Sequence, residues 1–228
     1  MAEQITSAQN PKIKNILKLQ QRSSERRKQN LIVIEGLREI NLAVKAGIKL
    51  NTLFVCSEII SIDDVITELN FGDAVFEVSL EVYNKLAYRG STEGLIALGQ
   101  PKYLNLEDLK LRKNPLVIVL ESVEKPGNLG AILRTADAAN VDAVIISDPL
   151  TDIYNPNVIR SSIGCVFTNQ VVACSSEEAI GWLNEKQITT YAAALKATQH
   201  YHEKDFTGPS AIVMGTEADG LTNKWLKN

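Results

Sequence analysis

Residues 116–214 alternate between short, continuous apolar runs and segments with helical periodicity, and this alternation limits the folds open to the chain. The apolar runs are LVIVLESV, DAVIISD, QVVACS, TTYAAAL and SAIVMG. A strand that is apolar along its whole length is buried on both faces, which is typical of a parallel sheet covered by helices. We therefore predict an α/β domain with a parallel sheet whose strands are connected by helices at 127–140, 155–167 and 176–187.

The first half of the chain alternates in the same way over shorter elements. Its predicted helices are 11–21, 38–47, 61–70 and 80–88, and its predicted strands are 31–36, 52–56, 74–79 and 94–99. This pattern predicts a small α/β layer domain, with a polar stretch at 22–30 between its first helix and its first strand. Residues 101–115 are polar and bracketed by prolines, which favours a link between domains. We expect one domain over 1–105 and a second over 106–228.

Charge and cysteine content exclude several classes of protein. The net charge is only -3, but seven basic residues outnumber two acidic ones within residues 1–30. Cys56, Cys165 and Cys174 show no CxxC spacing, so neither a zinc site nor a disulfide framework is expected. No apolar run approaches the length of a membrane span, and the N-terminus lacks the apolar core of a signal peptide. We expect a soluble, cytoplasmic protein without a metal or a membrane partner.

The stretch EKPGNLGAILRTADAAN, residues 124–140, places a cation in a helix that directly follows a buried strand. Leu129 and Leu133 belong to the apolar stripe of this helix, while Gly130, Arg134 and Asp137 share a flank. Asn128 stands where it can either cap the helix or face the crevice at the carboxyl end of the strand, which is where open α/β sheets bind ligands. Arg134 either presents a fixed positive charge there or pairs with Asp137 on a solvated face.

A dinucleotide-binding fold is an alternative interpretation of the same stretch. The turn Gly-Asn-Leu-Gly contains two of the three glycines of GxGxxG, and the central glycine that approaches a pyrophosphate is missing. Asp148, after the next strand, lies near the distance at which an acid that binds a ribose is expected. The incomplete glycine pattern makes this a minor alternative.

Three stretches of the second half together resemble the SpoU family of RNA ribose 2′-O-methyltransferases, part of the SPOUT superfamily. They are NLGAILRTADAAN, NPNVIRSSIGCVF and IVMGTEADGLT. The first half resembles the ribosomal-protein-like RNA-binding domain of the same family through ITSAQNPKIK, the IEG of residues 34–36 and STEGLIALG. The resemblance covers nearly the whole chain, in the order and spacing of the family.

The resemblance implies transfer of a methyl group from S-adenosylmethionine to a ribose 2′-hydroxyl in ribosomal or transfer RNA, with ribosomal RNA favoured. It also implies a homodimer and an α/β fold with a deep trefoil knot. The family continues into a third motif, whereas this chain stops at Asn228, so we expect an incomplete knot and weak cofactor binding by these 228 residues. A non-catalytic RNA-binding or assembly protein that keeps the fold is the alternative.

The resemblance also assigns roles to individual residues. Arg134 would be the central catalytic residue, and because a guanidinium accepts no proton we favour stabilisation of the developing oxyanion over a base role. Asn128 would orient the ribose or the arginine, and Glu217 would shape the cofactor loop. The residues expected to contact the cofactor are Gly215 and Thr216 through their backbones and Leu195 as a wall of the adenine site.

The RNA-binding residues are expected in the first half. Basic side chains near the N-terminus fit phosphate contacts, and Arg89 beside Tyr88 combines charge with a stacking surface. A solvated helix face is the alternative for any single one of them. The predicted RNA-binding residues are Lys12, Arg26, Arg27, Lys28 and Arg89.

Overall fold

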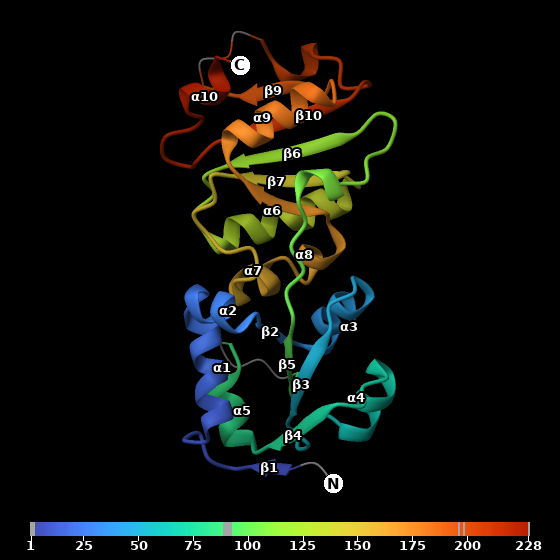
Figure 1. Ribbon diagram of the computed structural model, residues 1–228, viewed down its shortest axis with the longest axis vertical. Helices are drawn as coiled ribbons and strands as arrows, with labels where there is room; N and C mark the ends of the chain where they lie inside the picture. The colour runs from blue at the N-terminus through green and yellow to red at the C-terminus, as the bar shows by residue number, and fades with distance from the viewer. Residues whose placement is uncertain (1–2, 89–92, 196, 198, 228) are drawn as a thin grey trace. The chain divides into compact units, whose positions relative to one another are not determined.

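The computed structural model describes residues 3–88, 93–195, 197 and 199–227 (Figure 1). The chain divides into two compact units. Unit 1 comprises residues 1–102 with 154–167, and unit 2 comprises residues 103–153 with 168–228. Segment 154–167 therefore packs with the N-terminal half of the chain. Within the described residues, no helix combines the length and the apolar character that a membrane span requires.

Unit 1 is built on a five-stranded sheet of order β1-β4-β3-β5-β2. β1, β4 and β3 are parallel to one another, and β5 runs antiparallel to both β3 and β2. The sheet is therefore mixed, and its first strand was not predicted from the sequence. The strands are β1 (Glu3–Ile5), β2 (Ile32–Glu35), β3 (Leu50–Val55), β4 (Ala74–Val78) and β5 (Leu95–Gly99).

Two helices, α1 (Pro11–Gln21) and α5 (Leu80–Leu86), cover one face of this sheet. α1 begins where the side chain of Asn10 accepts a hydrogen bond from Lys12 N, at 2.8 Å, and Pro11 occupies the first turn. The buried residues of α1 are Ile13, Ile16 and Leu19, and Leu17 packs beside them partly buried. Figure 1 shows α3 (Leu37–Lys45) and α4 (Ile62–Leu69) on the other side of the sheet.

The polar stretch 22–30 contains a helix that was not predicted from the sequence. It forms α2 (Ser23–Gln29), which ends at Asn30 in the left-handed conformation, with φ 52°. Arg26 is only 3% exposed, and its Nη1 donates to the carbonyl oxygens of Leu19, at 2.5 Å, and Gln20, at 3.3 Å. These carbonyls lie in the last turn of α1, where helices leave acceptors unpaired. Arg26 therefore joins α2 to the end of α1.

The single helix predicted over 155–167 is broken into two. α7 (Pro156–Ser161) and α8 (Cys165–Thr168) are separated by Ile163 and Gly164, which have φ angles of 56° and 79°. The positive φ favours glycine at 164, and an added Cβ would also stand 2.7 Å from Leu42 Cδ1, at the end of a flexible side chain. In unit 1, the guanidinium of Arg160 donates to the Tyr88 carbonyl and lies 4.9 Å from the centre of the Tyr88 ring.

Unit 2 contains the predicted parallel sheet, with five strands in the order β8-β7-β6-β10-β9. The chain passes from β6 to β7 to β8 in one direction and then crosses back to β9. Because crossovers are right-handed, α6 (Pro126–Ala138) and α9 (Ser176–Glu185) lie on opposite faces. The strands are β6 (Leu116–Glu121), β7 (Ala143–Ser147), β8 (Val171–Cys174), β9 (Thr189–Ala193) and β10 (Ser210–Met214).

Helix α9 begins at Ser176, the first residue of the predicted range 176–187. Ser175, not Ser176, is its N-cap and forms a full capping box with Glu178. Ser176 is instead buried, and its Oγ accepts from Trp225 Nε1 at 3.1 Å. Trp225 belongs to α10 (Asn223–Leu226), a short helix that was not predicted and that packs with α9 on one face of the sheet.

The polar segment before β6 is anchored to unit 2 by one buried carboxylate. Asp142 lies just before β7, and its side chain is 2% exposed. It accepts hydrogen bonds from the guanidinium and the backbone N–H of Arg112, at 2.8–2.9 Å, and from Leu116 N at 2.8 Å. The same segment contains a short 3₁₀ helix, Leu106–Asp108, and a second one, Tyr201–Glu203, precedes β10.

Candidate active site

Two strands of unit 2 end in the same unusual backbone conformation at the same edge of the sheet. Ser122 follows β6 with φ 52°, and Asp148 follows β7 with φ 46°. Ser122 N donates to Ser147 O at 2.8 Å, and Asp148 N donates to Cys174 O at 2.9 Å. Left-handed φ values are costly for residues other than glycine and gather at functional sites. This edge, at the carboxyl ends of the strands, is where parallel sheets bind ligands.

A buried acid, Glu121, ties two distant segments together at this edge. It is the last residue of β6 and is 2% exposed. Its carboxylate accepts hydrogen bonds from Thr222 N, at 2.8 Å, and from Thr222 Oγ1, at 2.6 Å. Thr222 in turn caps α10. Sequence reasoning missed Glu121, although a charged residue at the end of an apolar strand was a usable signal.

The segment between β10 and Thr222 is a closed loop. Thr216 N donates to Gly220 O at 3.0 Å, and Gly220 N donates back to Thr216 O at 3.1 Å. Asp219 N also donates to Thr216 Oγ1, at 3.0 Å. Gly215 is essential to this closure, because a Cβ there would stand 2.1 Å from the backbone of Gly220. We call residues 215–220 the glycine loop.

The glycine loop meets the start of α6 through charged and polar side chains. Glu217 Oε2 lies 2.6 Å from Lys125 Nζ and accepts from Asn128 Nδ2 at 3.3 Å. The hydrogen bond from Lys125 holds the pKa of the Glu217 carboxyl below its ordinary value, and Asn128 acts in the same direction. Asn128 and Glu217 were both predicted site residues, and the structure brings them together. Lys125, the N-cap residue of α6, was missed because a surface lysine carries no sequence signal.

Arg134 lies on a different part of α6 from Asn128. The two are six positions apart, which places them about 9 Å apart along the axis and about 120° apart around it. Arg134 is exposed, and it forms no ion pair or hydrogen bond with any described residue. The alternative pairing with Asp137 is not present, since Asp137 accepts instead from Thr168 Oγ1. The structure thus leaves the Arg134 guanidinium available to an external anion.

The predicted cofactor residues differ in what they can offer. The backbone N–H of Thr216 is used within the glycine loop, while its carbonyl keeps a second lone pair. Gly220 has open space around the position of a Cβ, so a ligand can approach the loop backbone there. Leu195 follows β9 and is fully exposed in this structure, so it forms no wall with other described residues.

Asp148, the acid of the dinucleotide alternative, is committed to internal contacts. Its carboxylate accepts from Ser176 Oγ at 2.8 Å and Ser176 N at 3.2 Å, and it pairs with Lys224 at 3.3 Å. Burial alone would raise the pKa of Asp148, but these hydrogen bonds outweigh it and lower the pKa. The Asp148 carboxylate therefore joins β7 to α9 and α10, and these internal contacts do not support a role in binding a ribose. Among the described residues, no group of three potential ligands is arranged to hold a metal ion.

The predicted RNA-binding residues of unit 1 separate into three kinds. Arg26 is buried against α1, so the prediction that it contacts phosphate is corrected to a structural role. Lys12 pairs with Glu3 at 3.8 Å and lies 4.6 Å from the centre of the Phe76 ring. Arg27 and Lys28 are exposed on α2. Arg89 lies outside the described residues.

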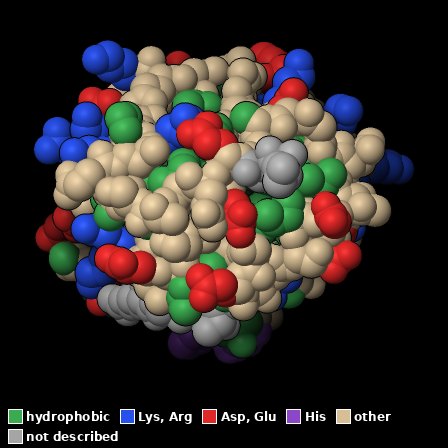
Figure 2. All heavy atoms as spheres, turned by 90° about the horizontal axis from the view of Figure 1, so that it is seen from below, with side chains coloured by type: hydrophobic (Ala, Val, Ile, Leu, Met, Phe, Trp, Pro, Cys, Tyr) green, Lys and Arg blue, Asp and Glu red, His purple; other side chains and the backbone are tan. Residues whose placement is uncertain are grey.

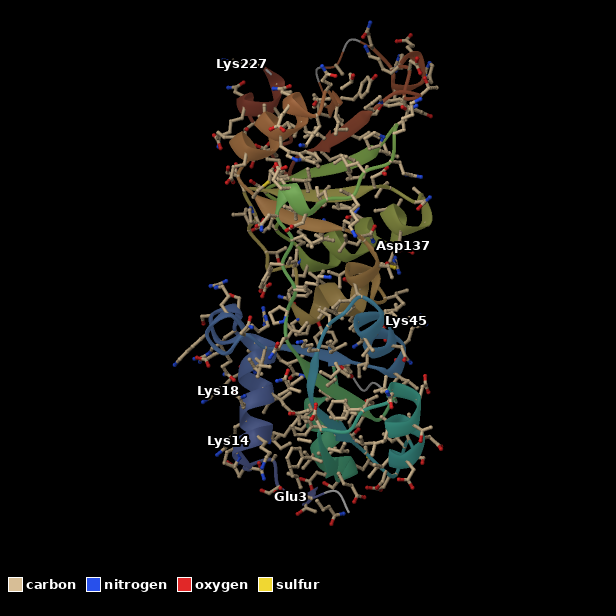
Figure 3. All side chains as sticks on the ribbon, turned by 45° about the vertical axis from the view of Figure 1, so that its right-hand side comes forward. Glu3, Lys14, Lys18, Lys45, Asp137 and Lys227 are labelled. Atoms are coloured by element: carbon tan, nitrogen blue, oxygen red, sulfur yellow. The ribbon has the colours of Figure 1, made fainter. Side chains whose placement is uncertain are left out.

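Two further lysines of unit 1, Lys14 and Lys18, are also exposed. Both project from the outer side of α1 in Figure 3, opposite the buried stripe of that helix. We use the name basic corner for a group of four exposed residues, which are Lys14, Lys18, Arg27 and Lys28. None of these four side chains forms an ion pair with a described residue. In the view of Figure 2, basic side chains lie mainly near the margin and acidic ones are interspersed.

Solved structures with the same fold define the class of protein. A crystal structure of an RNA 2′-O ribose methyltransferase is 36% identical and superposes with a TM-score of 0.85, covering 98% of this chain and 86% of that chain. An AdoMet-bound rRNA methyltransferase from Sinorhizobium meliloti is 26% identical with a TM-score of 0.89, covering 100% of this chain and 86% of that one. The fold is that of the SPOUT RNA methyltransferases.

The sequence comparisons make the assignment specific. Residues 115–228 match the SpoU rRNA Methylase family, and residues 10–97 match the MRM3-like substrate binding domain. The chain belongs to the SpoU rRNA Methylase family, as the resemblance predicted. Similar proteins include the 23S rRNA (guanosine(2553)-2′-O)-methyltransferase RlmP of Bacillus subtilis, 28% identical over 96% of this chain and 84% of RlmP. The 23S rRNA (guanosine-2′-O-)-methyltransferase RlmB of Vibrio cholerae is 34% identical over 69% of this chain and 66% of RlmB.

Proposed function

We propose that this protein transfers the methyl group of S-adenosylmethionine to a ribose 2′-hydroxyl of ribosomal RNA. The observation that carries the proposal is the meeting of the glycine loop with the start of α6, where Glu217 contacts Asn128. This meeting occurs in a chain of the SpoU rRNA Methylase family whose relatives RlmP and RlmB are 23S rRNA 2′-O-methyltransferases.

Arg134 is proposed as the catalytic residue. A ribose hydroxyl becomes a strong nucleophile only as its proton leaves, and the negative charge that develops on the oxygen needs a nearby donor. The exposed guanidinium of Arg134 supplies such donors but cannot accept the proton. We therefore assign the proton to a phosphate of the RNA, which Arg134 holds in place. The absence of any contact from Arg134 to described residues supports this role.

Asn128 and Glu217 are proposed to orient the reacting groups from within one chain. The Asn128 amide is fixed by the Glu217 carboxylate, which leaves the amide oxygen free to accept a hydrogen bond from a ribose hydroxyl. Because Asn128 and Arg134 lie about 120° apart on α6, one bound ribose reaches both more readily if a second copy of the chain supplies one of them. This geometry supports the predicted homodimer, which sedimentation velocity would detect.

The cofactor would bind beside the glycine loop, and it supplies an electrophilic methyl group on a positively charged sulfur. The residues present fit such a group, because open space at Gly220 lets a ligand approach the loop backbone and the Thr216 carbonyl retains an acceptor site. Gly215 contributes by permitting the loop to close. Leu195, exposed in this structure, becomes a contact only if bound cofactor covers it.

Unit 1 is proposed to bind the RNA. The match of residues 10–97 to a substrate binding domain supports this assignment, and the basic corner supplies four unpaired cations for phosphates. Lys12 is engaged with Glu3 and Phe76, so its contribution is expected to be smaller. The proposed substrate is ribosomal RNA, and the proposed location of the reaction is the cytoplasm.

The proposal is tested by incubating the protein with S-adenosylmethionine carrying a labelled methyl group and with ribosomal RNA that lacks native modification. We expect label in an RNA nucleotide whose 3′ linkage resists alkaline hydrolysis, which is the property of a 2′-O-methylated ribose. Label on a base would refute ribose methylation. RNA binding without any transfer would instead favour a non-catalytic RNA-binding protein with the same fold.

A further inference from the structure

The ion pair between Lys125 and Glu217 joins two segments that are 92 positions apart in the chain. Their side chains are 63% and 67% exposed, and the charged atoms are 2.6 Å apart. The same oxygen, Glu217 Oε2, also accepts from Asn128 Nδ2. One oxygen of the Glu217 carboxylate thus accepts hydrogen bonds from both the Lys125 ammonium and the Asn128 amide, which we place in the active site.

The glycine loop brings Glu217 to this position but does not hold its side chain. The loop is closed by the two backbone hydrogen bonds between Thr216 and Gly220, and the chain after it is anchored by Glu121 at Thr222. Glu217 lies between these fixed points, and among described residues its side chain has only Lys125 and Asn128 as hydrogen-bond partners. A long exposed side chain without such partners samples several rotamers.

The start of α6 is a position where a negative charge such as that of Glu217 is favourable. The first turn of this helix carries no acidic residue of its own, although helix N-termini favour anions. Glu217 supplies that charge from the glycine loop. Exposed ion pairs contribute little to stability, so the main effect of this one is expected on the geometry of the site.

We propose that Lys125 is a positioning residue, which holds the Glu217 carboxylate against Asn128 and thereby fixes the glycine loop at the start of α6. This inference rests on the proposed function and names a residue of the same site. Lys125 acts only through Glu217 and touches neither RNA nor cofactor. The ionisation of Glu217 agrees, since the hydrogen bond from Lys125 is the largest influence lowering the pKa of that carboxyl.

A double-mutant cycle tests the proposal in the full chain. Lys125→Met is made both in the natural background and with Glu217→Gln, and the rate of methyl transfer is measured in single-turnover experiments. We expect Lys125→Met to slow methyl transfer roughly five-fold in the natural background, because one exposed ion pair is lost. In the protein that already carries Glu217→Gln, we expect Lys125→Met to leave the rate unchanged. Lys125→Arg should restore most of the rate. Lys113→Met is the matched control, since Lys113 is an exposed lysine of unit 2, and it should have no effect.

Equal effects of Lys125→Met in the two backgrounds would overturn the proposal, because they would mean that Lys125 acts on the substrate directly. No effect in either background would overturn it as well. A second measurement is independent of activity: carboxyl NMR of the protein should show the pKa of Glu217 rising after Lys125→Met and unchanged after Lys113→Met. A wild-type protein that transfers no methyl group refutes the proposed function alone, and an unmoved pKa of Glu217 refutes the positioning role.

Discussion

Gly215 lies so close to Gly220 that a Cβ atom added to Gly215 would stand 2.1 Å from the Gly220 carbonyl oxygen. Because the obstacle is backbone rather than a flexible side chain, the glycine loop cannot keep its closure with any larger residue at this position.

We expect Gly215→Ala to lower the free energy of unfolding by about 1–3 kcal/mol, the cost of overpacking, and to reduce cofactor affinity. Thermal denaturation and calorimetric titration with S-adenosylmethionine measure the two effects. Gly181→Ala in α9 is the matched control, because nothing lies within 4 Å of its added Cβ. A Gly215→Ala protein with the melting temperature and affinity of the wild type would show that the loop is not closed in this way.

Arg134→Ala should reduce the rate of methyl transfer by roughly 100- to 1000-fold, as the loss of a donor to a developing oxyanion does elsewhere. RNA affinity should stay nearly unchanged, because one cation among many phosphate contacts is lost. Single-turnover transfer and a filter-binding assay separate these quantities. Arg134→Lys keeps the charge without the planar fork, so we expect a partial loss. Full activity of Arg134→Ala would remove this residue from the mechanism.

Replacing Lys14 and Lys18 by glutamine should weaken RNA binding and make it less sensitive to salt. Each phosphate contact contributes about 0.7–0.9 to the slope of log affinity against log salt concentration, so we expect the slope to fall by roughly 1.5. Lys45→Gln with Lys49→Gln removes the same charge from other exposed sites of unit 1 and is the control. The same fall in slope for both pairs would mean that the basic corner is not the binding surface.

Asp142→Asn should destabilise unit 2 by roughly 2 kcal/mol at neutral pH, because the carboxylate receives charge-assisted hydrogen bonds. Burial would raise the pKa of Asp142, but the hydrogen bonds from Arg112 and Leu116 outweigh it and lower the pKa below its ordinary value of 3.8. The stabilisation is therefore complete above that value and is lost as pH falls through the lower folded pKa. Melting curves between about pH 7 and pH 3 should show the wild type approaching the variant only below about pH 4. A difference independent of pH would contradict this account.

Much of the fold follows from local patterns in the sequence. The continuous apolar runs predicted the parallel strands of unit 2, and helical periodicity predicted α1 at residues 11–21, because both patterns are set within a few residues. The short motifs around Asn128 and Gly215 indicated the family, which the comparisons confirmed.

Only the tertiary structure decided which distant groups meet. Neither the ion pair of Lys125 with Glu217 nor the burial of Arg26 against α1 has a local signal in the sequence. From the sequence alone, a lysine or arginine is expected to be exposed to solvent, because its partner is not known. Likewise, periodicity shows that the segment 154–167 has an apolar face but not that this face packs within unit 1. A sequence pattern shows that one face of a helix or strand must be buried. Which segment buries that face depends on packing between residues that are far apart in the chain.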